Sequence, residues 1–251
     1  MESVGDWGSL LRETAYWLRP AQLRARAGRV PVGDTLRQLD RLAFGVLPLL
    51  AVVLFFVGMI LALQLATILK LLGVVEYVPD IVAVSMVREM APLLTGVVLS
   101  GYAGAAMAAE IGSMKVNEEL EAMEALSLPP VRMLVAPRFL AAAIAGPFVA
   151  IFACYIGILG GLLVGATMLG LSPVQYLHRS LDALNLTAVS LGVIKGEVFA
   201  LLVVAIATFE GLRVRGGAMG VGRATTAAVV KSIIAIIAAD LLLTVLFFNI
   251  T

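Results

Sequence analysis

The sequence predicts an all-α integral membrane protein with an N-terminal interfacial helix, five transmembrane helices and a cytoplasmic amphipathic helix. Of its 251 residues, 61% are hydrophobic and only 14% are charged, whereas about a quarter of the residues in a soluble domain are charged. The apolar residues gather in long runs, and each run can cross about 30 Å of hydrocarbon. Short polar segments separate the runs, which is typical of a polytopic membrane protein.

Residues 1–41 form the predicted N-terminal cytoplasmic segment, an amphipathic helix lying in the membrane interface. Leucine, tyrosine and tryptophan alternate there with seven arginines: Arg12, Arg19, Arg24, Arg26, Arg29, Arg37 and Arg41. Basic residues mixed with tryptophan and leucine suit such a helix, and a disordered basic tail is the alternative. Because no apolar core precedes Leu42, we do not expect a cleavable signal peptide.

Residues 42–251 form the predicted five-span domain, with spans at about 42–69, 81–109, 139–169, 183–209 and 226–248. Small residues recur at a spacing of four in the second span (Ser100, Gly104, Ala108, Gly112) and the third (Gly157, Gly161, Gly165). Such faces let helix backbones approach closely in lipid. We therefore expect close helix packing, either within one chain or between copies.

The distribution of lysine and arginine predicts the orientation. The N-terminal segment, the 110–138 connection and the 210–223 connection are rich in these residues, whereas the alternate connections carry only Lys70 and Arg179 near the ends of spans. Positive charge favours the cytoplasmic side. The N-terminus is therefore predicted inside and the C-terminus outside.

The 110–138 connection holds a predicted amphipathic helix at about 110–128. Leu120, Met123 and Leu126 recur at helical spacing among four glutamates, Glu118, Glu119, Glu121 and Glu124. This pattern indicates about three helical turns, ended by two prolines. So acidic a helix is expected to meet water or another protein rather than an anionic leaflet; a plain solvated connector is the alternative.

Five charges lie inside the apolar runs: Arg88, Glu89, Lys195, Glu197 and Asp240. Each costs a few kcal/mol at the bilayer centre, so such residues pair with one another or face a cavity. Lys195 and Asp240 are expected to pair or to reach water. Structural pairing and substrate contact both remain open for this set.

Catalysis by this chain is not expected. The sequence contains one cysteine and one histidine, so an intrachain disulfide is impossible and a metal site is not predicted. It has no nucleophile–base pair and no Gly-Lys of a phosphate-binding loop. No cofactor is therefore expected, and any ATP must be used by a partner chain.

Several motifs in order resemble the MlaE (YrbE) family, the permease subunits of ABC transporters that work with Mce-domain proteins in moving lipids. The motifs lie at 87–92, 101–110, 110–138, 194–196 and 211–226. The resemblance covers nearly the whole chain after about residue 40. Small departures are Asn117, where threonine is common, and Met219, where an acidic residue is common.

The resemblance implies a permease that moves phospholipid or a related lipid between membranes. Its implied partners are a second copy of the chain, a cytoplasmic ABC ATPase and a Mce-domain substrate-binding protein. The implied location is a bacterial inner membrane, and a plastid envelope remains open. The 110–128 helix would be the coupling helix to the ATPase, with Glu118, Leu120, Glu121 and Met123 in contact and the two apolar residues as anchors.

The resemblance also places the lipid. Glu89, beside Arg88, would face the head group, and the end of the first span would line the acyl chains with Leu61, Leu65, Ile68 and Leu69. Two other functions remain. An ion-coupled secondary transporter would use Glu89, Lys195 and Asp240 as a relay, although the two halves show no clear internal repeat. A non-transporting scaffold would tolerate replacement of these charges.

Overall fold

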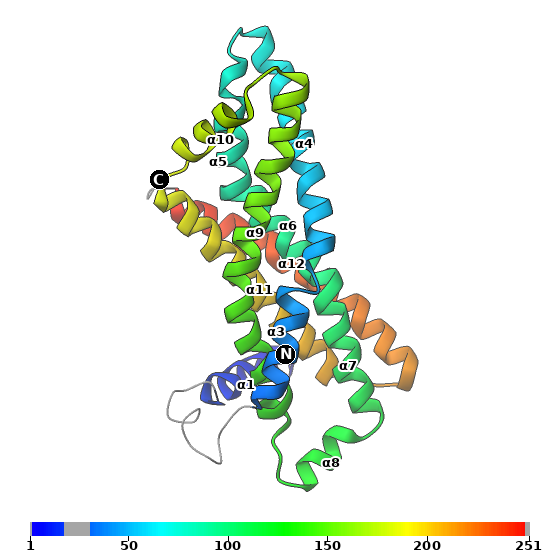
Figure 1. Cartoon of the computed structure of the whole chain (residues 1–251). Helices are drawn as coiled ribbons and strands as arrows, with labels where there is room; N and C mark the ends of the chain where they lie inside the picture. Colours follow the sequence, from blue (N-terminus) through cyan, green and yellow to red (C-terminus); the bar gives the residue numbers. More distant parts are fainter. Residues whose placement is uncertain (1, 18–30, 249–251) are drawn as a thin grey trace. The chain divides into compact units, whose positions relative to one another are not determined.

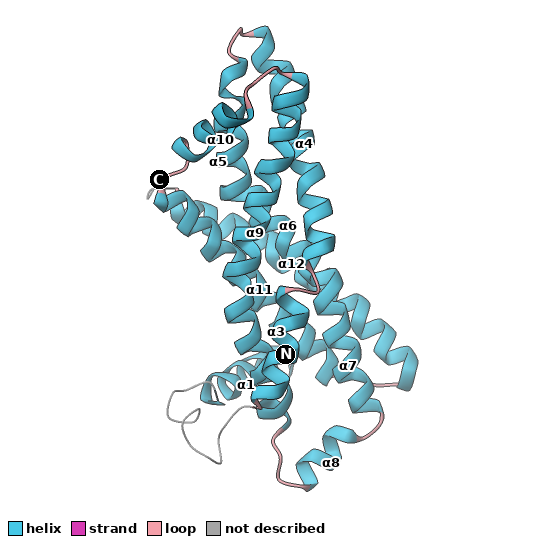
Figure 2. Ribbon diagram, in the orientation of Figure 1, coloured by secondary structure: helices cyan, strands magenta, loops and turns pink. Residues whose placement is uncertain are grey.

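The structure, a computed structural model, describes residues 2–17 and 31–248, and Figure 2 shows helices and no strand among these residues. Five helical stretches are long and apolar enough to cross a membrane: Val32–Leu71, Val75–Val116, Val131–Met168, Leu186–Leu212 and Gly217–Phe247. The predicted all-α class is confirmed. The chain is therefore a multi-pass helical membrane protein.

The N-terminal segment contains two described helices, α1 (Glu2–Trp17) and α3 (Val32–Ala43), and Figure 1 shows both. α3 buries Leu42 and Gln38 and leaves its charged face exposed. Four of the predicted interfacial arginines, Arg19, Arg24, Arg26 and Arg29, lie outside the described residues.

Within the first helical stretch, the apolar helix α4 (Leu47–Leu71) begins later than the predicted start of the span at residue 42. A short turn after α3 precedes α4, whereas the apolar run alone placed the start at Leu42. Pro48 lies in the first turn of α4, where its missing N–H leaves no intrahelical bond unmade.

The chain divides into two compact units. The first comprises Met1–Val46, Leu99–Ala145 and Ala200–Ile236, and the second comprises Leu47–Val98, Gly146–Phe199 and Ile237–Thr251. The N-terminal segment and the two connections that were predicted to be cytoplasmic belong to the first unit. The two connections predicted outside belong to the second.

The second span is a continuous helical stretch interrupted by two π-helical segments. It contains η2 (Val75–Tyr77), α5 (Val78–Ser85), η3 (Met86–Met90), α6 (Ala91–Leu99), η4 (Ser100–Gly104) and α7 (Ala105–Val116). The π segments are η3 and η4. A π segment inserts an extra residue into the helical turn and re-aims the side chains that it carries. η3 carries Arg88 and Glu89.

The third span consists of the π segment η5 (Val131–Val135) and α9 (Ala136–Met168). Glycines bring α9 into backbone contact with α4 inside one unit. A Cβ on Gly58 would overlap the carbonyl oxygen of Gly157, and one on Gly160 would overlap that of Phe55. The close packing expected from the small residues therefore occurs, at this pair of helices, within the chain.

α10 (Pro173–Asp182) begins at a proline, which suits the first turn of a helix, and it packs against α5, as Figure 1 shows. Arg179 fixes it there, because its Nε and Nη2 donate to the two carboxylate oxygens of Asp80 at 3.1 and 2.9 Å. The same guanidinium lies 4.7 Å from the ring centre of Tyr77. Such a bidentate pair holds a surface helix in one orientation.

The last two spans are α11 (Leu186–Leu212) and α12 (Gly217–Phe247). Asn185 caps α11, since its side-chain oxygen accepts a hydrogen bond from the Ala188 N–H at 2.6 Å. α12 starts nine residues before the predicted 226, because the basic stretch around Arg223 is already helical. Two glycines with positive φ, Gly216 and Gly217, make the turn before it.

Candidate functional site

A polar cluster lies among the spans of the second unit. Its centre is Lys195 of α11, whose side chain is 3% exposed. The Lys195 ammonium lies 2.6 Å from Glu89 Oε2 of η3 and 2.9 Å from Asp240 Oδ1 of α12. It also donates to Thr244 Oγ1 at 2.7 Å. We call Glu89, Lys195, Asp240 and Thr244 the ionic cluster.

One ammonium is shared by two carboxylates in the ionic cluster. Lys195 donates hydrogen bonds to Glu89 and Thr244 and forms an ion pair with Asp240, whose Oδ1 is buried without a hydrogen-bond partner. Thr244 in turn donates to Glu89 Oε1 at 3.3 Å. A charge without a partner in a membrane span would be expensive. The cluster therefore links three helical elements that are far apart in the sequence.

A small cavity adjoins the ionic cluster. It measures about 20 Å³, and its lining residues are Arg88, Glu89, Leu191, Lys195, Thr244 and Phe247. That volume holds about one water molecule. A lipid head group cannot enter it in this arrangement.

The ionic cluster agrees in part with the sequence prediction. Lys195 and Asp240 form the expected pair. Glu89 lines the small cavity together with Arg88, but it also pairs with Lys195, which the sequence did not predict. Helical periodicity alone could not find this pair, because the π segment η3 changes the direction of Glu89.

Glu197 stands apart from the ionic cluster. It lies two residues beyond Lys195, which on a helix is about 200° around the axis. Its Oε2 is buried without a hydrogen-bond partner, and a Cβ on Gly146 would overlap that oxygen. The glycine therefore makes the space that the Glu197 side chain occupies.

The four predicted acyl-chain residues lie on α4. The buried stripe of this helix is Leu50, Leu54, Gly58, Ala62 and Ala66, so the predicted residues lie beside it. Leu61, Leu65 and Leu69 are half-buried and Ile68 is 59% exposed. None of them lines the cavity at the ionic cluster.

The predicted coupling helix is shorter than expected. The sequence indicated one helix at about 110–128, but α7 ends at Val116 and α8 covers only Glu119–Ala125, as Figure 1 shows. Glu118 breaks the helix because its φ of 60° is left-handed. A salt bridge between Lys115 and Glu121 joins the two pieces, and the hydrogen bond from Lys115 lowers the pKa of Glu121.

The predicted anchor Leu120 must be corrected. Its side chain is 4% exposed and packs inside this chain, so it cannot also fill a pocket of a partner. Met123 is half-buried, and Leu126 is 72% exposed. The exposed apolar surface at α8 therefore comes from Leu126, its C-cap residue, while Glu118 and Glu121 are also exposed.

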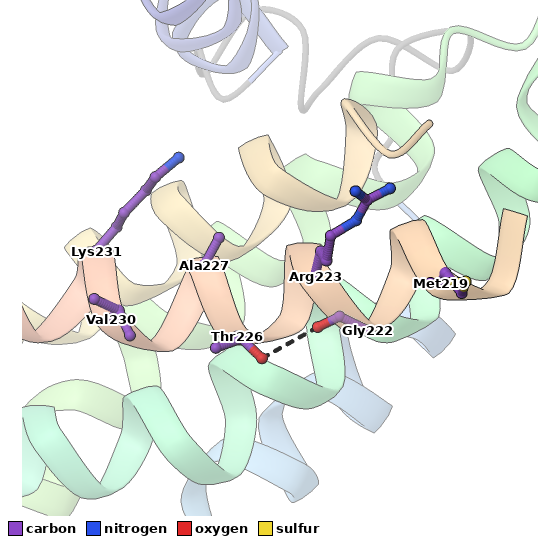
Figure 3. Close-up of a pocket in the computed structure, with 7 residues that line it drawn as sticks. All are labelled: Met219, Gly222, Arg223, Thr226, Ala227, Val230 and Lys231. Atoms are coloured by element: carbon purple, nitrogen blue, oxygen red, sulfur yellow. Dashed lines mark hydrogen bonds between the residues drawn. The ribbon is translucent and has the colours of Figure 1, made fainter. Parts of the chain in front are cut away.

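One face of α12 is hollowed, and Figure 3 shows the residues that line this groove. It measures about 680 Å³, and its lining comes from α12 alone: Met219, Gly222, Arg223, Thr226, Ala227, Val230 and Lys231. Only 11% of the most apolar part of α12 is buried within the chain. Lys231 pairs with Glu210 of α11 at 2.7 Å although its side chain is 55% exposed.

Five apolar helical spans, with charges paired inside them, define the class of polytopic membrane proteins. Residues 35–246 match the family described as Permease MlaE, so the chain belongs to the MlaE permease family. The matched range contains the ionic cluster, α8 and the α12 groove.

Curated relatives agree with this family. A probable ABC transporter permease protein of Rickettsia typhi is 39% identical over 86% of this chain and 83% of its own length. The intermembrane phospholipid transport system permease protein MlaE of Haemophilus influenzae is 35% identical over 82% of this chain and 80% of its own. The chloroplastic protein trigalactosyldiacylglycerol 1 of Arabidopsis thaliana is 31% identical over 90% of this chain and 65% of its own length.

Proposed function

We propose that this chain is the membrane permease subunit of an ABC transporter that moves phospholipid or a related lipid between membranes. The observation that carries the proposal is the MlaE family match, which spans residues 35–246. It is supported by the Haemophilus relative, whose name specifies intermembrane phospholipid transport. ATP would be hydrolysed by a separate ATPase subunit.

The proposed lipid site lies between two copies of the chain. The cavity at the ionic cluster holds about one water, so a head group needs additional space. Arg88 and Glu89 would face that head group. Leu61, Leu65, Ile68 and Leu69 of α4 would contact the acyl chains. A mostly apolar cavity with a few placed charges is the usual form of a site for an amphiphile.

The α12 groove supports the proposed homodimer. Arg223 and Lys231 on this face would be costly if they met lipid tails. Gly222 and Ala227 allow the close approach of a second helix. A second copy of the chain that covers this groove would remove both charges from the lipid and bury the apolar surface that α12 leaves exposed.

The proposed coupling runs through α8. Met123 and Leu126 would seat in a groove of the ATPase, with Glu118 and Glu121 at the rim. The salt bridge between Lys115 and Glu121 ties α8 to α7, which belongs to the second span. Motion of the ATPase would therefore reach the span that carries Glu89.

The proposed location is a bacterial inner membrane, with the N-terminus and α8 in the cytoplasm and the C-terminus outside. The distribution of lysine and arginine supports this orientation. It leaves α10 and the 72–78 connection on the outer side, where a Mce-domain protein would receive or deliver the lipid.

Co-purification followed by native mass spectrometry tests this function. We expect an assembly that contains two copies of this chain, an ATPase subunit and bound phospholipid. Assembly without lipid, together with ATPase stimulation by a sugar or an amino acid, would contradict the proposal. Transport that continues without ATP but stops when the proton gradient is collapsed would instead identify an ion-coupled transporter that uses the ionic cluster as a relay.

A further inference from the structure

A second polar cavity lies in the first unit and shares no residue with the ionic cluster. It measures about 350 Å³ and lies between α3, the second span and the start of α9. α3 contributes Asp34, Arg37, Gln38 and Arg41, and the other helices contribute Glu110 and Arg138. We call it the α3 cavity.

Two buried polar groups on the wall of the α3 cavity lack a hydrogen-bond partner. The Arg138 side chain is 3% exposed, and its Nε is buried without a partner. Gln38 is 8% exposed, and its Oε1 is also unpartnered. A buried polar atom left unpaired costs about 1–3 kcal/mol. Because both residues line the α3 cavity, one donor and one acceptor without partners lie in its wall.

The charges of the α3 cavity favour an anion. Glu110 is already neutralised, because its Oε2 lies 2.9 Å from Arg41 Nη1 and its Oε1 lies 3.2 Å from Arg138 Nη2. Arg37 is exposed at the rim. Three arginines against Asp34 and Glu110 leave a formal charge of +1. Arginine is the residue best suited to phosphate, which its planar group can bind with two hydrogen bonds.

The remaining walls are apolar. Met114, Met133 and Leu134 line the α3 cavity. An adjoining cavity of about 460 Å³ shares Arg41 and Glu110 and extends past Tyr102 and Ala106. Apolar walls beside a basic rim suit an amphiphile better than a free ion.

We propose that the α3 cavity binds the head group of an anionic, hydroxyl-bearing phospholipid. The phosphate would accept hydrogen bonds from Arg138 Nε and Arg37, and a head-group hydroxyl would donate to Gln38 Oε1. The lipid would come from the leaflet beside α3, whose exposed Val32 and Leu36 suit a membrane interface. This lipid holds α3 against α7 and α9 and is not the transported cargo, so the inference stands whether or not the cargo is a lipid.

Thermal unfolding of the full-length chain in detergent tests this site. The probes are short-chain phosphatidylglycerol, short-chain phosphatidylcholine, glycerol phosphate and inorganic phosphate. We expect phosphatidylglycerol to raise the unfolding temperature in a saturable way. Phosphatidylcholine, which has no hydroxyl and no net charge, should bind more weakly.

Two variants and a matched control assign the effect to the α3 cavity. Arg37→Gln removes one charge-assisted hydrogen bond and should weaken phosphatidylglycerol binding about five- to tenfold. Gln38→Leu should discriminate less between phosphatidylglycerol and phosphatidylcholine, because it removes the hydroxyl acceptor. Arg12→Gln, on α1, makes the same change of charge outside the cavity and should leave binding unchanged.

The probes also separate the possible sources of the phosphate. Glycerol phosphate that binds as tightly as phosphatidylglycerol would overturn the lipid assignment in favour of a soluble phosphate ester. No saturable shift with any probe, or equal losses for Arg37→Gln and Arg12→Gln, would show that the α3 cavity holds only water and would overturn the site itself.

Discussion

Replacement of Lys195 by methionine should destabilise the chain more than any other single change in the ionic cluster. Lys195 is buried and contacts Glu89, Asp240 and Thr244 within 3 Å. Its loss removes the cation that Glu89 and Asp240 share. Removing one partner of a buried ion pair costs about 3–5 kcal/mol. Because Glu89 is 34% exposed and water screens it, we take the lower end, about 3 kcal/mol.

This loss of stability can be measured as a decrease in the unfolding temperature. In a chain of this size, each kcal/mol shifts the midpoint by about 2–4 °C, so Lys195→Met should lower it by about 6–12 °C. Lys115→Met is the matched control. It breaks the exposed salt bridge to Glu121 and should cause a much smaller shift, because exposed ion pairs contribute little.

The partners of Lys195 provide the decisive comparison. Asp240→Leu alone should cost less than Lys195→Met, because Lys195 keeps Glu89 at 2.6 Å. The double variant should recover part of the Lys195→Met loss, since only one carboxylate then lacks its cation. Strictly additive losses in this double-mutant cycle, or equal shifts for Lys195→Met and Lys115→Met, would refute the pairing argument.

Three further predictions concern packing, coupling and topology. Gly58→Ala should lower the unfolding temperature, because the added methyl overlaps the carbonyl oxygen of Gly157. Gly101→Ala is the control and should leave the unfolding temperature unchanged, because no atom lies within 4 Å of its added Cβ. Equal effects of the two variants would argue against the α4–α9 contact. Leu126→Asp should reduce ATPase co-purification while the permease stays inserted, and full retention would leave α8 as a connector. Cysteines at Ser127 and Ser172 should label from opposite sides of sealed vesicles, and labelling from one side would contradict the orientation.

The sequence was sufficient to predict the helical class and the five spans, because long apolar runs dominate the composition. It placed their ends less well. The turn before α4 and the helical start of α12 at Gly217 lie where hydrophobicity gives no signal. The π segments also leave no mark in composition, and one of them sets the direction of Glu89.

The sequence identified most residues of the ionic cluster but not how they pair. Charges inside apolar runs identified Glu89, Lys195 and Asp240, since such residues are rare in spans. Which charge meets which depends on contacts between distant segments, so the second partner of Lys195 was missed. The role of Leu120 was wrong because helical periodicity marks an apolar face without showing whether its own chain or a partner covers it.

ATP-driven lipid transfer is the activity that the proposed function requires of this chain and its ATPase subunit. The chain would be reconstituted with its ATPase subunit in vesicles that carry a labelled phospholipid, and transfer of the label to acceptor vesicles or to a lipid-binding partner would be measured. We expect transfer that requires hydrolysable ATP and that Glu89→Gln impairs without loss of insertion or of the bound ATPase. Full transfer by Glu89→Gln would remove that residue from the lipid site, and no ATP-dependent transfer by the intact complex would contradict the account as a whole.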